Sequence, residues 1–182
     1  MFWIIATIEV KRIQPHQGDL LRELRLRALQ DAPDAFVENY DTASQQSIEH
    51  WQAIASKHAT SHHAVNYFGF LKGELSGMVG AYITDSDPDI VNLCAMWVAP
   101  EARHQGVGKA LVDRVVRWAQ EAHVGKVRLW VNCENIDAIK FYYHCGFKDT
   151  GITTVFPATP NAVEKEMAYE FSGNQTKPTT RA

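Results

Sequence analysis

The chain has 182 residues, of which 46% are hydrophobic and 21% are charged, and this composition is typical of a globular domain with a full core. Its 18 basic and 21 acidic residues give a formal net charge of −3, which argues against nucleic-acid binding driven by bulk positive charge. The 3 cysteines form no Cys-x-x-Cys pair, which favours a reducing compartment over a secreted disulfide fold.

The amino-terminal apolar run is too short to cross a membrane. It covers residues 1–8 and ends at Glu9, and no basic region precedes it. We therefore expect a cytoplasmic protein with no signal peptide and no membrane contact.

The first part of the sequence predicts one strand and two helices. Residues 8–13 alternate between apolar and polar side chains, which indicates a strand. A helix begins at Asp19, places leucines on one face and ends before Pro33. After a polar stretch, a shorter helix follows Ser47, whose hydroxyl suits an N-cap.

A hairpin and a buried strand follow. Residues 65–71 and 75–84 predict two strands, joined by a turn at Lys72-Gly73-Glu74. The acidic cluster at residues 85–89 predicts a second turn. Residues 90–98 are almost continuously apolar, as expected for a strand covered on both faces.

The clearest predicted helix spans Gly106–His123, with an apolar stripe along one face and Gly125 at its C′ position. The strand Val127–Val131 follows it. From Ile90 onward these three elements have the length of a βαβ crossover, so two parallel strands should lie side by side with the helix packed on one face.

The carboxy-terminal part predicts a helix and a closing strand. Asn135 suits the N-cap of a helix that runs to Cys145 and is ended by Gly146. The last strand is Val163–Phe171, and residues 172–182 form a polar tail that we expect to be disordered. Without a repeat or linker, residues 1–171 are expected to form one α/β domain.

The most informative segment is the glycine-rich turn between Val98 and Lys109. It joins a buried strand to a helix whose first N–H groups lack intrahelical partners, and the helix dipole favours negative charge there. Gly106 and Gly108 allow a ligand to reach those amides without a Cβ in the way. Arg103, His104, Gln105 and Lys109 add donors, so the segment predicts a diphosphate cradle.

Two other interpretations of this segment exist. The glycines could serve packing in a plain strand-to-helix turn. A dinucleotide-binding fold fits poorly. Leu111 occupies the position of the third glycine in the dinucleotide-binding motif, and the basic residues Lys126 and Arg128 lie where that motif has an acidic residue. The spacing alone does not separate the cradle from the plain turn.

Two motifs together resemble the GCN5-related N-acetyltransferase (GNAT) superfamily. The first is Arg103-x-x-Gly106-x-Gly108, which resembles the acetyl-CoA signature of that family. The second is Asn135-x-x-Ala138-x-x-Phe141-Tyr142-x-x-x-Gly146-Phe147, in matching register. They cover roughly residues 90–150. The resemblance implies a mixed sheet of about six to seven strands flanked by about four helices.

The resemblance also implies roles for individual residues. Backbone groups of Met96 and Val98 would bind the pantetheine arm, and Arg103 would lie near the pyrophosphate. Asn135 would contact the cofactor or cap its helix, and Tyr142 would protonate the departing CoA sulfur. The amides expected to hold the pyrophosphate are those of His104, Gln105, Gly106, Val107, Gly108 and Lys109.

Some assignments have alternatives within the sequence. Tyr142 lies on the apolar face of its helix, where a tyrosine often packs in the core with its hydroxyl bonded locally. The three cysteines are expected to pack inertly, and the histidines near residue 60 lack partners for a metal site. Glu38, Asp89 and Glu134 are carboxylates near the expected acceptor site, but no spacing singles one out as a general base.

The sequence thus predicts an enzyme that transfers the acetyl group of acetyl-CoA, its co-substrate, to a primary amine by direct attack, without a metal. The acceptor, a small molecule or peptide, should lie between residues 33–51 and the loop 156–161. Two alternatives remain, a transferase for another acyl-CoA and a non-catalytic CoA sensor. A homodimer is compatible with the exposed sheet edges of such folds.

Overall fold

A single seven-stranded sheet with five α-helices makes up the computed structural model, which describes residues 7–155 and 162–171. This confirms the predicted α/β class and mixed sheet. The elements in chain order are β1 Ile8–Arg12, α1 Gly18–Asp31, α2 Tyr40–Ser44, α3 Ile48–Thr60, β2 Ala64–Leu71, β3 Glu74–Thr84, β4 Asp87–Val98, α4 Val107–Glu121, β5 Lys126–Asn132, α5 Ile136–His144, β6 Lys148–Val155 and β7 Val163–Glu170. The 3₁₀ turns η1 (Pro33–Ala35) and η2 (Pro100–Ala102) precede α2 and α4.

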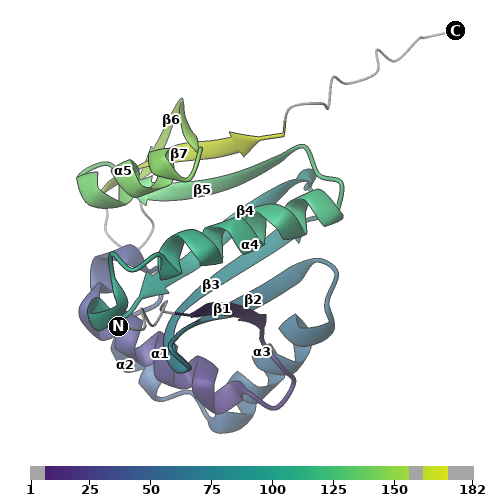
Figure 1. Ribbon diagram of the computed structural model, residues 1–182, viewed down its shortest axis with the longest axis vertical. Helices are drawn as coiled ribbons and strands as arrows, with labels where there is room; N and C mark the ends of the chain where they lie inside the picture. The colour runs from purple at the N-terminus through teal and green to yellow at the C-terminus, as the bar shows by residue number, and fades with distance from the viewer. Residues whose placement is uncertain (1–6, 156–161, 172–182) are drawn as a thin grey trace, which may run out of the picture.

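The sheet has two halves. Its strand order is β1-β2-β3-β4-β5-β7-β6, and every neighbouring pair is antiparallel except β4 and β5. In Figure 1, α4 crosses the front of the strands, α1, α2 and α3 gather around β1 and β2, and α5 lies with β6 and β7 at the other end. The parallel β4–β5 pair therefore joins the two halves and confirms the predicted crossover.

Two paired glycines let α4 lie close to the sheet. Gly69 on β2 pairs with Gly77 on β3. A Cβ on Gly69 would lie 2.9 Å from Val107 Cγ1, and one on Gly77 would lie 3.1 Å from Leu111 Cδ1 and 2.9 Å from the Trp97 carbonyl oxygen. Contacts this short leave no room for a methyl group, so the Val107 and Leu111 side chains at the beginning of α4 pack directly on the glycine backbone of the sheet.

Three local predictions were wrong or incomplete. The C′ residue of α4 in the left-handed conformation is His123 rather than Gly125, with φ of 58°. The acidic turn is shorter than expected, because β4 already begins at Asp87. The polar stretch after α1 contains η1 and α2, and the strand β6 was not predicted at all.

The Lys72-Gly73 turn is confirmed, with φ of 54° and 86°, and so is the Ser47 cap, whose hydroxyl accepts from the His50 N–H at 3.3 Å. Across the two described ranges, no helix is both long enough and apolar enough to cross a membrane. The predicted disordered tail at residues 172–182 lies outside the described residues, and so does the loop 156–161.

Candidate active site

The two halves of the sheet separate part-way along β4. Parallel pairing with β5 is limited to Ile90, Val91 and Asn92. Arg128 on β5 fastens the last pair, because its Nε and Nη2 donate to the Asn92 side-chain oxygen at 3.0 and 2.8 Å. Beyond this point the edge of β4 that faces β5 has no strand partner among residues 7–155 and 162–171, so its backbone groups are available to a ligand.

An irregularity in β4 marks the same stretch. Met78 of β3 pairs with Trp97, whereas Gly80 pairs with Cys94, so β4 carries an extra residue here. Ala95 has φ of 50°, a left-handed conformation that is costly for a residue with a side chain. Strain of this kind concentrates at functional sites, and Ala95 and Met96 at the bulge line the opening between the two halves.

A cavity of about 470 Å³ occupies the opening. Its walls come from the end of α1 and η1, from β4 at the bulge, from the end of β5, from α5 and from β7. The lining residues are Asp31, Ala32, Pro33, Asp34, Ala35, Leu93, Cys94, Ala95, Met96, Leu129, Trp130, Val131, Asn132, Glu134, Asn135, Ala138, Tyr142 and Glu164.

The N-terminus of α4 has the form of an anion site. The first helical hydrogen bond runs from the Ala110 N–H to the Gly106 oxygen, so the N–H groups of Val107, Gly108 and Lys109 have no acceptor within the helix. Gly106 is the N-cap with φ of 92°, and His104 before it has φ of 59°. The geometry therefore fits a bound phosphate group, although contact of this loop with the pyrophosphate of CoA stays a prediction.

Gly108 connects this anion site to the cavity. A Cβ on Gly108 would lie 3.2 Å from Phe141 Cζ and 3.3 Å from Met96 Cε. Gly108 thus lies against β4 and α5, two elements that line the cavity, and a larger residue would press on their side chains.

The Arg103 guanidinium is bound by other groups of the protein. Its guanidinium forms an ion pair with Asp31 at the end of α1, and its Nε donates to the Val98 carbonyl oxygen at 3.0 Å. The same Asp31 carboxylate accepts from the Trp97 indole at 2.9 Å. Asp31 was missed by sequence analysis, because nothing in its local pattern indicates partners 66 and 72 residues away.

These contacts set the ionisation of Asp31. Burial acts to raise its pKa, but the hydrogen bonds from Trp97 and Arg103 outweigh it and hold the pKa below the usual value. A lowered pKa means stability that is present above the unfolded pKa of about 3.9 and is lost as pH falls through the folded value.

Asp31→Asn should therefore lower the Tm at neutral pH, by about 2–4 °C for the loss of roughly 1 kcal/mol. The difference from the parent should shrink as pH falls below about 4, because the parent then loses the same carboxylate. Calorimetry of both proteins across this range tests it, with Asp34→Asn as the control. A Tm difference between the parent and Asp31→Asn that is the same at every pH would contradict a lowered pKa for Asp31.

Tyr142 is buried with its hydroxyl at the cavity. The residue is only 8% exposed, and its ring packs between Phe141 and Phe147 at 5.2 and 5.8 Å. Within the described residues no hydrogen bond to its hydroxyl is found, and its role as the acid stays a prediction. Burial raises the pKa of Tyr142, and the phenol stays protonated well above neutral pH.

The start of α5 is as predicted at Asn135, whose side-chain oxygen accepts from the Ala138 N–H at 3.1 Å. Asn135 also lines the cavity, so the cap and the proposed cofactor contact are compatible. Met96 lines the cavity as well, whereas the Val98 carbonyl already accepts from Arg103.

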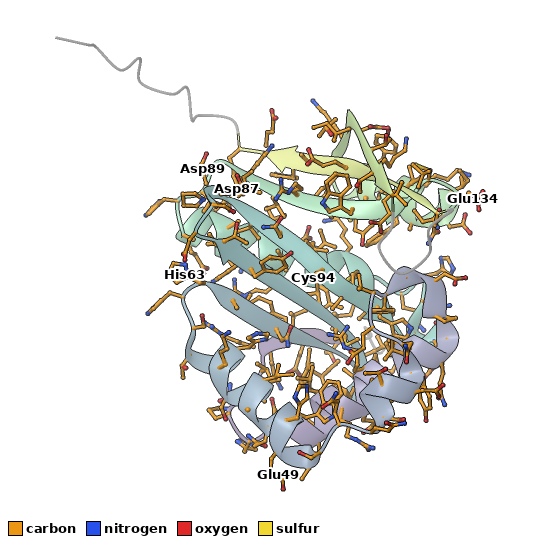
Figure 2. The ribbon with its side chains drawn as sticks, turned by 180° about the vertical axis from the view of Figure 1, so that it is seen from behind. Glu49, His63, Asp87, Asp89, Cys94 and Glu134 are labelled. Carbon is orange, nitrogen blue, oxygen red and sulfur yellow. The ribbon has the colours of Figure 1, made fainter. Side chains whose placement is uncertain are left out.

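The prediction that all three cysteines pack inertly is wrong for Cys94. Cys145 is buried and Cys133 is half-buried, but Cys94 is exposed, because the bulge breaks the covering of β4. Figure 2 shows it in the middle of the sheet. Its exposed area faces the cavity, where the many surrounding protein atoms desolvate the thiol and raise the pKa of Cys94 to about 11, so it is a poor nucleophile at neutral pH.

The three candidate bases lie in different places. Asp89 is at the far end of β4 (Figure 2), where its carboxylate accepts from the Gly125 N–H at 2.6 Å. The Glu38 Oε2 atom lies 3.9 Å from Arg25 Nε, and Glu38 does not line the cavity. Glu134 does line the cavity. Glu164 on β7 also lines the cavity. Sequence analysis missed it, because the pattern of residues in β7 predicts a closing strand but no contact with the cavity.

Comparison with known proteins agrees with this geometry. The family model described as "Acetyltransferase (GNAT) family" matches residues 25–147. The uncharacterized protein YdhI of Bacillus subtilis is 33% identical over 93 residues, which are 51% of each chain. The chain spans about half the length, or less, of the curated relatives it matches.

Solved structures share the fold. A GNAT-family acetyltransferase from Streptococcus pneumoniae superposes with a TM-score of 0.77 at 18% identity, over 91% of this chain and 100% of that one. The PaiA N-acetyltransferase of Thermoplasma acidophilum, solved with coenzyme A, gives 0.70 at 16% identity, over 91% and 99%. With its bulged β4, its open β4–β5 junction and the matching family model, this chain belongs to the GNAT acetyltransferase family.

Proposed function

We propose that this protein transfers the acetyl group of acetyl-CoA to a primary amine, which attacks the thioester directly while both substrates are bound. The observation that carries the proposal is the cavity at the β4–β5 opening, where an unpaired strand edge and the buried Tyr142 hydroxyl meet. The family match and the coenzyme A complex of a protein with the same fold support the choice of thioester.

The two ends of acetyl-CoA have separate sites in this proposal. The pyrophosphate binds the amides at the start of α4, where the helix dipole and the glycines favour an anion. The pantetheine arm carries amide groups, and it extends the sheet by bonding to the free edge of β4 at Met96. Val98 contributes only if Arg103 releases its carbonyl oxygen.

The reaction itself needs charge stabilisation at two atoms. Attack of the amine on the thioester carbon places negative charge on the carbonyl oxygen, and a backbone N–H at the bulge stabilises it. When the tetrahedral species collapses, the C–S bond breaks and the electron pair leaves with sulfur. The proton that sulfur acquires comes from the Tyr142 hydroxyl. The attacking nitrogen loses one proton to solvent, and solvent returns a proton to the tyrosinate.

The acidity of Tyr142 is compatible with this role. A thiol has an ordinary pKa of about 8.5 and a phenol about 10, so full transfer to free thiolate is slightly uphill. The burial that raises the pKa of Tyr142 also raises the pKa of a thiol bound beside it, so a hydrogen bond between the two groups stays favourable. Cys94 is not required, because its thiol remains protonated.

Release of free CoA thiol from acetyl-CoA, measured with a panel of amines, tests the proposal. We expect amine-dependent release that follows the acetylated product one to one. Succinyl-CoA and propionyl-CoA in parallel test the transferase for another acyl group. Tight CoA binding without release for any amine would contradict the proposal and favour a sensor.

A further inference from the structure

The charge of the cavity points to the chemistry of the acceptor. Its ionisable lining residues, apart from Cys94 and Tyr142, are four carboxylates, Asp31, Asp34, Glu134 and Glu164. The lining contains no lysine, arginine or histidine within the described residues, and residues 156–161, which follow β6 in the sequence, include no charged residue. No basic side chain of that segment is therefore available to neutralise the carboxylates.

Three of the carboxylates are without a counter-charge. Asp31 is paired with Arg103. For Asp34, Glu134 and Glu164, the ion pairs found among residues 7–155 and 162–171 include no partner within 4.0 Å. They come from η1, from the turn before α5 and from β7, so three separate elements bring negative charge to one cavity.

Glu164 is the most enclosed of the three. It is half-buried on β7 opposite Asn132 of β5, whereas Asp34 and Glu134 are exposed. Burial raises the pKa of Glu164, and no nearby cation offsets this. A carboxylate desolvated without a partner is costly unless a ligand supplies the opposite charge.

The cavity also holds a group that marks it as a substrate site. The Tyr142 hydroxyl, on a side chain more than nine-tenths buried, lines the same cavity without a hydrogen-bond partner in the described part of the chain. Acetyl-CoA would bring further negative charge close by, and its pantetheine arm is neutral. The uncompensated carboxylates are therefore left for the acceptor.

We infer that the acceptor is a small amine that carries at least one positive charge in addition to its reacting amino group, held by Asp34, Glu134 and Glu164. This inference rests on the proposed function and names the substrate class of the same site. One ammonium group cannot balance three carboxylates, whereas a diamine or polyamine places a second cation beside them. A free amino acid or a carboxyl-bearing acceptor adds a fourth unbalanced anion and is repelled.

Three amines with the same five-carbon chain test the charge requirement. Cadaverine carries a second ammonium, n-pentylamine carries none, and δ-aminovalerate carries a carboxylate. We expect kcat/KM to be about fivefold to tenfold higher for cadaverine than for n-pentylamine, with δ-aminovalerate the poorest. The advantage of cadaverine should shrink as salt is raised, because the carboxylates are partly exposed.

Charge-neutral variants show which residues produce the preference. In Glu134→Gln and Glu164→Gln, the ratio of kcat/KM for cadaverine to that for n-pentylamine should fall about threefold each. Glu170→Gln, on the same strand as Glu164 but outside the cavity lining, should leave the ratio unchanged. Because the readout is a ratio within one variant, a general loss of activity does not affect it.

Calorimetric titration of cadaverine into the protein saturated with CoA adds a readout without turnover. Equal use of the three amines, a preference for δ-aminovalerate, or an unchanged ratio in both glutamine variants would overturn the inference while leaving amine acetylation intact. Failure of the proposed function is distinguishable, since no amine would then release thiol. Such a result together with absence of cadaverine binding would overturn both.

Discussion

Replacing Tyr142 by Phe is expected to lower kcat by about a hundredfold or more, the usual effect of losing a positioned proton donor. The KM for acetyl-CoA should change little, because the ring still packs between Phe141 and Phe147. Steady-state rates and calorimetric titration of CoA measure the two quantities separately. Tyr143→Phe is the control, since that residue is the exposed neighbour on the same helix.

The pH profile provides a second test of Tyr142. Its pKa is raised by burial, so the protonated form that acts as acid persists at pH values where an ordinary tyrosine, with a pKa of about 10, begins to ionise. The kcat of the parent should therefore not decline on the alkaline side up to about that pH. Full turnover by Tyr142→Phe, or an alkaline limb well below it, would contradict the acid role.

Gly106→Glu is expected to weaken CoA binding by about a hundredfold or more. It introduces a side chain at φ of 92°, beside Ile8 Cδ1 at 3.2 Å, and a negative charge at the helix end that binds the pyrophosphate. The new carboxylate would weaken CoA binding in two ways. It would repel the pyrophosphate, and it would compete with the pyrophosphate for the N–H groups of Val107 and Gly108. Calorimetric titration of CoA measures the loss.

Gly73→Glu is the matched control for this variant. Gly73 has φ of 86° and open space around its Cβ position, so both variants carry a similar backbone cost of about 1–2 kcal/mol. Their unfolding midpoints should therefore be lowered to a similar extent, whereas only Gly106→Glu should lose CoA. Equal CoA affinity in both would show that the start of α4 does not hold the pyrophosphate.

Local patterns identify most of the fold. The apolar stripe of α4, the continuous apolar run of β4 and the Lys72-Gly73 turn each follow from neighbouring residues, and the structure confirms them. β6 could not be predicted in this way, because all eight of its residues are exposed and no alternation marks its faces. Its pairing with β7 depends on hydrogen bonds between backbones rather than on side-chain pattern.

The candidate site likewise has some features that local sequence predicts and others that it does not. The glycine-rich turn and Tyr142 belong to motifs that are contiguous in sequence. The bulge at Ala95, the link from Asp31 to Arg103 and the approach of Glu164 are set by contacts across elements far apart in the chain. No residue pattern near Asp31 or Glu164 encodes those neighbours, so only the folded arrangement reveals them.

The close seating of α4 on Gly69 and Gly77 has a consequence for substrate length. The Val107 and Leu111 side chains of α4 lie directly against the glycine backbone there, so the helix does not slide along the sheet without steric overlap. The start of α4 and the bulge at Ala95 are therefore held at a constant distance from each other. This distance limits how short the molecule that carries the acyl group can be. If the pyrophosphate and the thioester bind at these two places, as proposed, we expect an acyl carrier shorter than pantetheine with its nucleotide to be a poor substrate, because it would not reach both.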